Sequence, residues 1–258
     1  MRFGICTTPD HLDLLEELGY DYIEMSVTKT MGLSEEEQEE VRRKLAASPV
    51  KCEAFNILFP KTMELIDGNT DEAALREYLH RAMALIKSFG AEVVVFGSGK
   101  CRRCPDNLSL REAYPKLVQV YRITGEVAKE YGITVVIEPL SRKETNTINL
   151  MSEGAMLEAD VNMENVQLLS DYFHVMANHD SIESMETIRH FGHIHIASGN
   201  GRKYPVSEEG EEYASYIGTL KKIGYNGRIS IEGKTENMEE DARAAIRLLR
   251  ELEVKDYE

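Results

Sequence analysis

The stretch Ile133-Thr-Val-Val-Ile-Glu138-Pro-Leu-Ser-Arg142-Lys-Glu144-Thr-Asn146 decides the fold prediction. A run of β-branched residues ends here in a carboxylate and a proline, which is typical of a buried parallel strand with Glu138 at its C-terminal end. Any strand end can carry an exposed acid, so Glu138 alone would not indicate a site. The prediction gains weight because three other predicted strands end in comparable side chains.

Short apolar runs alternate with amphipathic stretches along the whole chain, a pattern that indicates repeated β–α units and a parallel sheet. The eight predicted strands are 2–6, 22–26, 51–56, 92–96, 134–138, 166–171, 193–197 and 228–232. The predicted helices are 9–18, 34–47, 71–89, 110–131, 181–191, 210–223 and 238–252, and the assignment of 148–159 is the weakest. Glycines that favour a left-handed C-cap end four of the helices, at Gly19, Gly90, Gly132 and Gly224.

Eight such units in 258 residues, with no linker between them, predict one domain over 1–258 with the α/β fold of a closed (β/α)₈ TIM barrel. The alternative is an open sheet with a dinucleotide site at Gly97-Ser-Gly99. That motif needs a third glycine where the chain has Arg102, so the match fails. Active sites of barrels lie at the C-terminal ends of the strands.

Composition excludes several classes of protein. The hydrophobic content of 42% and charged content of 29% are those of a soluble globular protein, and no apolar run is long enough to cross a membrane. The N-terminus lacks the features of a secretion signal, so we expect a cytoplasmic protein. The net charge of −15 disfavours a nucleic-acid partner, because binding to a polyanion depends on Lys and Arg.

The four cysteines are Cys6, Cys52, Cys101 and Cys104, too few for a disulfide scaffold in a chain of this length. Cys101-Arg-Arg-Cys104 has the spacing of some zinc and redox sites. No second C-x-x-C and no nearby histidine pair completes a structural zinc site. We therefore predict a loop with two free thiols.

Four predicted strands bring a metal-type set of side chains to one end of the barrel. Glu138, Asp171 and Glu232 end three of these strands, and His195 lies in the seventh. Each has an ordinary alternative: Asp171 could cap a helix, His195 could be a core histidine, and the glutamates could be solvated. The occurrence of all four side chains at the ends of consecutive predicted strands predicts a site for Mn²⁺ or Mg²⁺, and also for Co²⁺, because these ions accept oxygen ligands and imidazole.

The chain resembles the xylose isomerase-like TIM barrel superfamily, in particular the sugar isomerase and epimerase branch that contains the D-tagatose and D-psicose 3-epimerases. The first motif, Glu138-Pro-Leu-Ser-Arg-Lys-Glu144-Thr-Asn146, is similar to the family's E-P-L-N-R-x-E-T-N. The other motifs are Asp171-Tyr-Phe-His174, similar to D-x-x-H, Gly192-His-Ile-His195, similar to G-H-x-H, and Ile229-Ser-Ile-Glu232 in the last strand. The resemblance covers the whole chain in strand order.

The resemblance implies roles for seven residues. It makes Glu138, Asp171, His195 and Glu232 the ligands of one divalent ion, with Mn²⁺ as the first choice, and Glu138 and Glu232 the catalytic acid/base pair. It implies that Glu144, His174 and Arg202 bind the substrate's carbonyl end. Arg202 lies one residue further from the metal histidine than in the family, and Ser198 stands where an acid is common. These departures leave the specificity open.

The implied activity is that of a metal-dependent sugar isomerase or epimerase that abstracts a proton next to a carbonyl and passes through an enediolate. The same intermediate serves a sugar or inosose dehydratase, which stays open. An endonuclease IV-like phosphodiesterase is less favoured. It needs more metals and more histidines at strand ends, whereas His11, His80, His179 and His190 fall in predicted helices or loops.

The expected substrate is a free or simply derivatised monosaccharide or keto-sugar, because no phosphate-cradling motif is evident. The resemblance also implies a homo-oligomer. Residues that could select the sugar from the first four strands are Phe3, Cys6, Glu24, Asn56, Arg102 and Arg103, and we expect most of these to be wall or surface.

Overall fold

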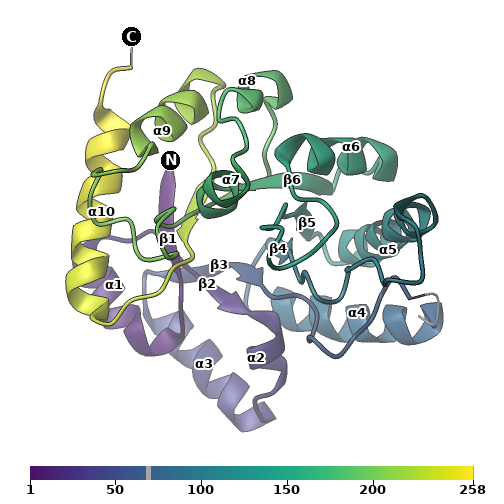
Figure 1. The fold of residues 1–258 in the computed structure, drawn as a ribbon. Helices are drawn as coiled ribbons and strands as arrows, with labels where there is room; N and C mark the ends of the chain where they lie inside the picture. Colours follow the sequence, from purple (N-terminus) through teal and green to yellow (C-terminus); the bar gives the residue numbers. More distant parts are fainter. Residues whose placement is uncertain (68–70, 258) are drawn as a thin grey trace.

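The computed structural model describes residues 1–67 and 71–257, and eight parallel strands in it form a closed barrel in chain order (Figure 1). The strands are β1 Arg2–Cys6, β2 Tyr22–Ser26, β3 Lys51–Asn56, β4 Val93–Phe96, β5 Thr134–Ile137, β6 Val166–Asp171, β7 His193–Ile196 and β8 Arg228–Ile231. The prediction of a (β/α)₈ barrel is confirmed. Glu138 and Glu232 each lie one residue beyond the strand that was predicted to end with them.

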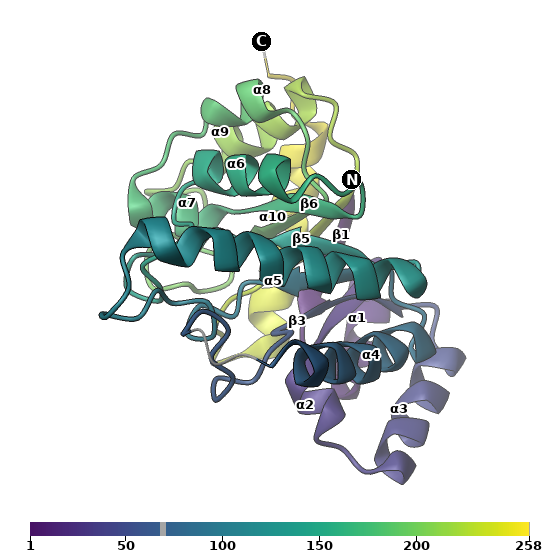
Figure 2. The same ribbon diagram turned by 90° about the vertical axis from the view of Figure 1, so that its right-hand side faces the viewer.

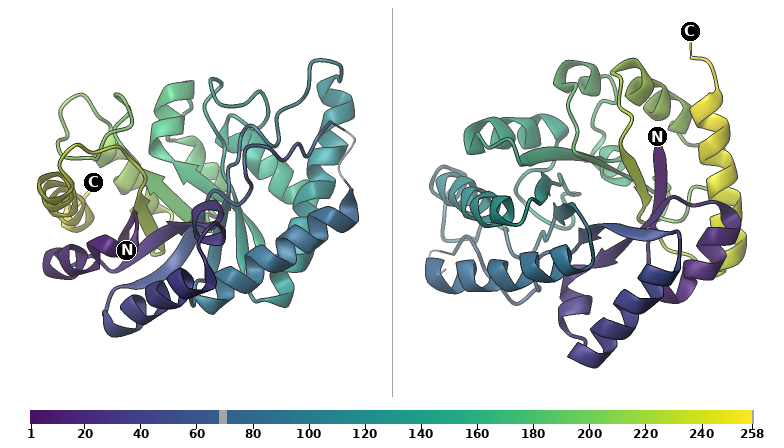
Figure 3. Two further views of the ribbon diagram at one scale, coloured as in Figure 1. Left: turned by 90° about the horizontal axis from the view of Figure 1, so that it is seen from below. Right: turned by 180° about the vertical axis from the view of Figure 1, so that it is seen from behind.

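A ring of helices surrounds the barrel, as the view from behind in Figure 3 shows. Its members are α1 Leu12–Leu18, α2 Val27–Met31, α3 Glu35–Ala47, α4 Glu72–Ser88, α5 Leu110–Glu130, α6 Met151–Val161, α7 Tyr172–Asn178, α8 Ser184–Ile188, α9 Tyr213–Lys222 and α10 Met238–Val254, with a 3₁₀ turn at Pro9–His11. Figure 2 shows the long α5 between α4 and α6. None of the described helices has the length and apolar character that crossing a membrane requires.

Two short helices were not predicted, and both follow a strand directly. α2 begins after Ser26, whose hydroxyl accepts the backbone N–H of Lys29, and α7 begins after Asp171, whose carboxylate accepts that of Phe173. The predicted glycine stops are confirmed. Gly19, Gly90, Gly132 and Gly224 have φ values of 77°, 82°, 68° and 77°, in the left-handed region that glycine adopts most easily.

The barrel interior changes character along its axis. Alternate strand residues point inward, and on β3 to β6 those at the N-terminal side are apolar and form a cluster that includes Val136 of β5 and Leu169 of β6. Two residues further along the same inward faces come Glu138 and Asp171. The period of two therefore places both carboxylates inside the C-terminal mouth, above these apolar residues.

Candidate metal centre

The structure brings the four predicted metal ligands together at the mouth of the barrel. Glu138, Asp171, His195 and Glu232 each offer one ligand atom, and these atoms all lie within 4.8 Å of one another. They come from the ends of β5, β6, β7 and β8, consecutive strands of the closed sheet. Three are buried, and the Glu232 side chain is 21% exposed.

The donor atoms are suited to a divalent cation. Oε1 of Glu138 and Nδ1 of His195 are buried and have no hydrogen-bond partner within the described residues. His195 Nδ1 lies 3.5 Å from that oxygen and 3.3 Å from Oε2 of Glu232. Buried polar atoms without partners are costly, and a cation at this point would satisfy both. Three carboxylates and one imidazole match the preferences of Mn²⁺ and of similar ions.

Asp171 both caps a helix and faces the cluster, the two roles that its position in the sequence suggested. Oδ1 accepts the backbone N–H of Phe173 at 2.8 Å and so caps α7, while Oδ2 faces the cluster. His195 is likewise satisfied on one side only, because its Nε2 lies 3.0 Å from Oε1 of Glu24. Asp171 and His195 therefore each have a structural role, as a helix cap and as a partner of Glu24, and also present a second atom to the cluster.

The electrostatics separate the two glutamates. Burial is the main cause that raises the pKa of Glu138, and the charge of Glu232 adds to it, while the nearby imidazole of His195 opposes both. Burial also acts to raise the pKa of Glu232. The charges of His195 and Arg202 outweigh that effect and lower this pKa to about 2.

The backbone at Glu138 is fixed by a buried arginine. Nε of Arg102 donates to the Gly97 carbonyl at 2.7 Å, and its terminal nitrogens donate to the carbonyls of Glu138 at 2.7 Å and Thr147 at 2.6 Å. The Arg102 side chain is fully buried. The suggestion that Arg102 selects the sugar is therefore wrong, because three of its four bonds go to backbone carbonyls and the fourth, at 3.4 Å, goes to the Thr147 hydroxyl.

The three residues predicted to bind substrate lie beside the cluster. His174 Nδ1 accepts the backbone N–H of Ser141 at 3.0 Å, so the ring proton is on Nε2. That atom is 3.6 Å from Oδ2 of Asp171 and has no hydrogen-bond partner among the described residues. Glu144 lies 3.9 Å from the same imidazole and its side chain is 41% exposed.

Arg202 reaches into the cluster from the loop after β7. Its guanidinium contacts Oε2 of Glu232, lies 3.3 Å from Oδ2 of Asp171 and stacks 5.0 Å from the Phe173 ring centroid. The residue has a φ of 55°, a left-handed conformation that is unusual for a non-glycine residue. The offset in sequence that distinguishes Arg202 from the family pattern therefore does not keep its side chain away from the site.

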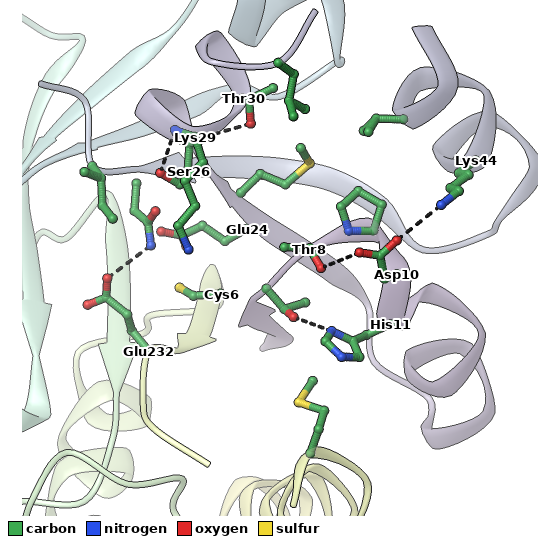
Figure 4. A pocket seen from close by; sticks show the side chains of 18 of the residues that line it. Cys6, Thr8, Asp10, His11, Glu24, Ser26, Lys29, Thr30, Lys44 and Glu232 are labelled. Atoms are coloured by element: carbon green, nitrogen blue, oxygen red, sulfur yellow. Dashed lines mark hydrogen bonds and ion pairs between the residues drawn. The ribbon is translucent and has the colours of Figure 1, made fainter. Parts of the chain in front are cut away.

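The cluster opens into a cleft with two arms. The larger, of about 1190 Å³, extends over β1, β2 and α3, and Figure 4 shows Cys6, Glu24 and Glu232 at one end with Asp10 and Lys44 at the other. The smaller, of about 530 Å³, extends over the loops after β3, β4 and β5. Of the six candidates for sugar selection, Cys6, Glu24 and Asn56 line the larger arm, whereas Phe3, Arg102 and Arg103 line neither.

Several cleft residues escaped the sequence analysis. His11, Lys29 and Lys44 line the larger arm, although they lie in helices or turns rather than at strand ends. For His11 and Lys29 the position shortly after β1 and β2 was a signal, whereas Lys44 lies within α3 and its place in the sequence gave none. Cys101 and Cys104 are buried free thiols, as predicted.

The fold and the cluster define a (β/α)₈ barrel with a candidate divalent-metal site at its C-terminal mouth. The chain belongs to the xylose isomerase-like TIM barrel family, whose model matches residues 12–252. This confirms the resemblance seen in the sequence motifs.

The chain is similar to known sugar epimerases and isomerases. It is 32% identical over 128 residues to D-psicose 3-epimerase of Ruminiclostridium cellulolyticum, covering 46% of this chain and 41% of that protein. It is 25% identical to inosose isomerase of Bacillus licheniformis, covering 95% of this chain and 90% of that protein. The match spans about half or less of the length of four of the related epimerases, and 74% of the L-ribulose 3-epimerase of Methylomonas sp..

Solved structures share the fold over the full length. A D-psicose 3-epimerase crystallised in the presence of D-fructose has a TM-score of 0.85 at 20% identity, covering 99% of this chain and 100% of that one. The IOLI protein with a binding zinc atom has a TM-score of 0.77 at 19% identity, covering 100% and 99%.

Proposed function

We propose that this protein is a metal-dependent sugar isomerase or epimerase that moves a proton next to a carbonyl through an enediolate. The observation that carries the proposal is the cluster of three carboxylates and His195, with two buried donor atoms that lack partners, beside the free Nε2–H of His174. The epimerase and isomerase names of its relatives support the same reaction class.

Glu138, Asp171, His195 and Glu232 would hold one divalent ion, with Mn²⁺ as the first choice. When bound, such an ion polarises the substrate carbonyl and stabilises the negative charge that proton removal leaves on its oxygen. The zinc in the structurally similar IOLI protein supports a divalent metal.

The remaining chemistry falls to the side chains. Glu138 and Glu232 extend from strands three positions apart in the closed barrel, so they can reach a substrate between them from different sides. If one takes the proton and the other returns one to the same carbon, the centre is inverted, which is epimerisation. Return to the neighbouring carbon gives isomerisation, and loss of a β-hydroxyl gives dehydration.

Three residues would orient the substrate. His174 donates Nε2–H to a substrate oxygen, since Ser141 fixes this tautomer. Arg202 balances the charge of Glu232 and Asp171, and Glu144 accepts a substrate hydroxyl at the more exposed edge.

The substrate we propose is a sugar or keto-sugar, free or simply derivatised. The larger arm of the cleft, at about 1190 Å³, exceeds what one sugar ring fills, because pockets of roughly 300–1000 Å³ hold drug-sized ligands. A substituent on the ring can therefore be accommodated.

Three further features stay predictions. The resemblance supports a homo-oligomer and Mn²⁺ as the metal, and the sequence supports a cytoplasmic location.

The test separates metal binding from proton transfer. Asp171→Ala and His195→Ala each remove a ligand, so bound metal and turnover should fall together. Glu138→Gln and Glu232→Gln keep an oxygen donor but lose the basic carboxylate, so solvent deuterium exchange into substrate should fall more than metal content. The exposed Glu236→Gln is the control and should match the wild type.

Substrates for this test should include ketoses, aldoses, inososes and keto-glycosides, each with and without phosphate. Near-normal exchange and turnover in both glutamine variants would contradict the acid/base assignment. Activity restricted to phosphorylated sugars would contradict the proposed substrate class.

A further inference from the structure

A second buried carboxylate lies directly beneath the metal cluster. Oε1 of Glu24 is 3.0 Å from Nε2 of His195, and Oε2 is 2.8 Å from Nε2 of His193. The Ser230 hydroxyl donates to Oε2 at 2.6 Å and is itself 2.8 Å from the Tyr22 hydroxyl. All five side chains are within the barrel and at most 1% exposed.

This arrangement fixes the tautomers of two histidines. An ionised carboxylate only accepts hydrogen bonds, so each imidazole must carry a proton on the Nε2 that faces Glu24. A neutral His195 with its proton on Nε2 has its lone pair on Nδ1, the atom that faces Glu138 and Glu232.

We propose that Glu24 is the positioning residue of the metal centre: it keeps the His195 proton on Nε2, so that the lone pair on Nδ1 faces the metal. The inference rests on the proposed function, because it needs the metal site. Carboxylates behind ligand histidines fix ring orientation and raise ligand basicity, and their loss typically weakens metal binding by about 10–100-fold.

A different use of the same residue can be excluded on geometry. Cys6, Glu24 and His195 also lie close enough to hold a metal ion. Both oxygens of Glu24 already accept hydrogen bonds, and the His195 nitrogen on this side is the donor of one of them. A thiolate site here would break the bonds that orient His195 toward the larger cluster.

The experiment compares the full-length variants Glu24→Gln and Ser230→Ala, each freed of metal and titrated with Mn²⁺ by calorimetry. Glu24→Gln keeps the shape but has only one oxygen, so it cannot accept protons from both histidines. We expect its Kd for Mn²⁺ to rise about 10–100-fold. Ser230→Ala removes a donor to Glu24 whose hydroxyl has no hydrogen bond to His195 among the described residues, and its Kd should stay within about threefold of the wild type.

A second readout is independent of metal. Nitrogen-15 NMR of the metal-free protein reports which nitrogen of each histidine carries the proton. His193 and His195 should both carry a proton on Nε2 in the wild type, and at least one should lose that proton in Glu24→Gln. Circular dichroism checks that the variants are folded.

Three results would overturn the inference: an unchanged Kd in Glu24→Gln, an equal loss in Ser230→Ala, or both histidines keeping Nε2–H in Glu24→Gln. Failure of the proposed function looks different. In that case the wild type itself would not bind Mn²⁺ or turn over sugars, while the histidine tautomers would still report on Glu24.

Discussion

Replacing Arg102 by methionine should destabilise the protein strongly, although arginine side chains are usually exposed at protein surfaces. Methionine has a similar length but cannot donate hydrogen bonds. The change would leave the buried carbonyls of Gly97, Glu138 and Thr147 without the donors that now lie at 2.6–2.7 Å. These carbonyls connect the loop after β4, the end of β5 and the segment that follows the first motif.

The magnitude follows from the three bonds. A hydrogen bond from a charged donor contributes about 1.5–3 kcal/mol, and part of the sum is offset because a charge no longer has to be buried. The net loss in unfolding free energy is then about 3–5 kcal/mol. For a chain of this length each kcal/mol lowers Tm by about 2 °C, which gives a fall of roughly 6–10 °C.

Thermal unfolding followed by far-UV circular dichroism measures this effect. The matched control is Arg103→Met, one residue away, where the side chain is exposed and the expected change in Tm is about 1 °C or less. If Arg102→Met unfolded within about 2 °C of Arg103→Met, the three bonds would not stabilise the fold and the reasoning would be refuted.

Two further predictions concern the site and the pH dependence. A Cβ at Gly97 would lie 2.0 Å from Oε2 of Glu138, so Gly97→Ala should displace this carboxylate and weaken Mn²⁺ binding about tenfold or more by calorimetry; wild-type affinity would contradict the contact. Burial raises the pKa of Glu158 in α6 to about 7, so its folded state holds a proton that the unfolded state loses above about pH 4.5. The stability of the wild type should therefore fall as pH rises from about 4.5 to 7. Glu158→Gln should be more stable than the wild type by about 1 kcal/mol at pH 8, a value reduced for the partial exposure of the side chain, and equally stable at pH 4. Thermal melts at the two pH values measure this difference, and its absence would show that the charge is solvated.

The sequence predicted the strands and the four-residue cluster because both depend on local patterns. A parallel strand buried on both faces reads as an apolar run, and the residue that ends it is identified directly. Once the strand order is known, closure brings the ends of β5 to β8 together without further information. The stop signals at the four glycines worked for the same reason.

The sequence did not reveal the roles of Glu24 and Arg102, because these depend on contacts between residues that are far apart in the chain. Glu24 meets His193 and His195 although 169 and 171 positions separate them, and nothing near Glu24 in the sequence marks this contact. Arg102 was misjudged because arginine is usually exposed. Only the chain path places three backbone carbonyls around its guanidinium. The short α2 and α7, of five and seven residues, are too brief for a helical period to show.

The two buried polar groups of residues differ in a way that suits a catalytic centre. In the lower group, around Glu24, the carboxylate accepts three hydrogen bonds, whereas in the upper group Glu138, His174 and His195 each present a buried atom with no partner. Both oxygens of Glu24 have partners, although Nδ1 of His193 beside it has none among the described residues. The bond from His195 to Glu24 holds the His195 ring so that the unpartnered Nδ1 faces Glu138 and Glu232. Glu24 and Glu232 also line the larger arm, but other residues of that lining, such as His11 and Lys29, lie outside both groups. These outer residues can therefore change with the substrate while the reacting groups stay fixed.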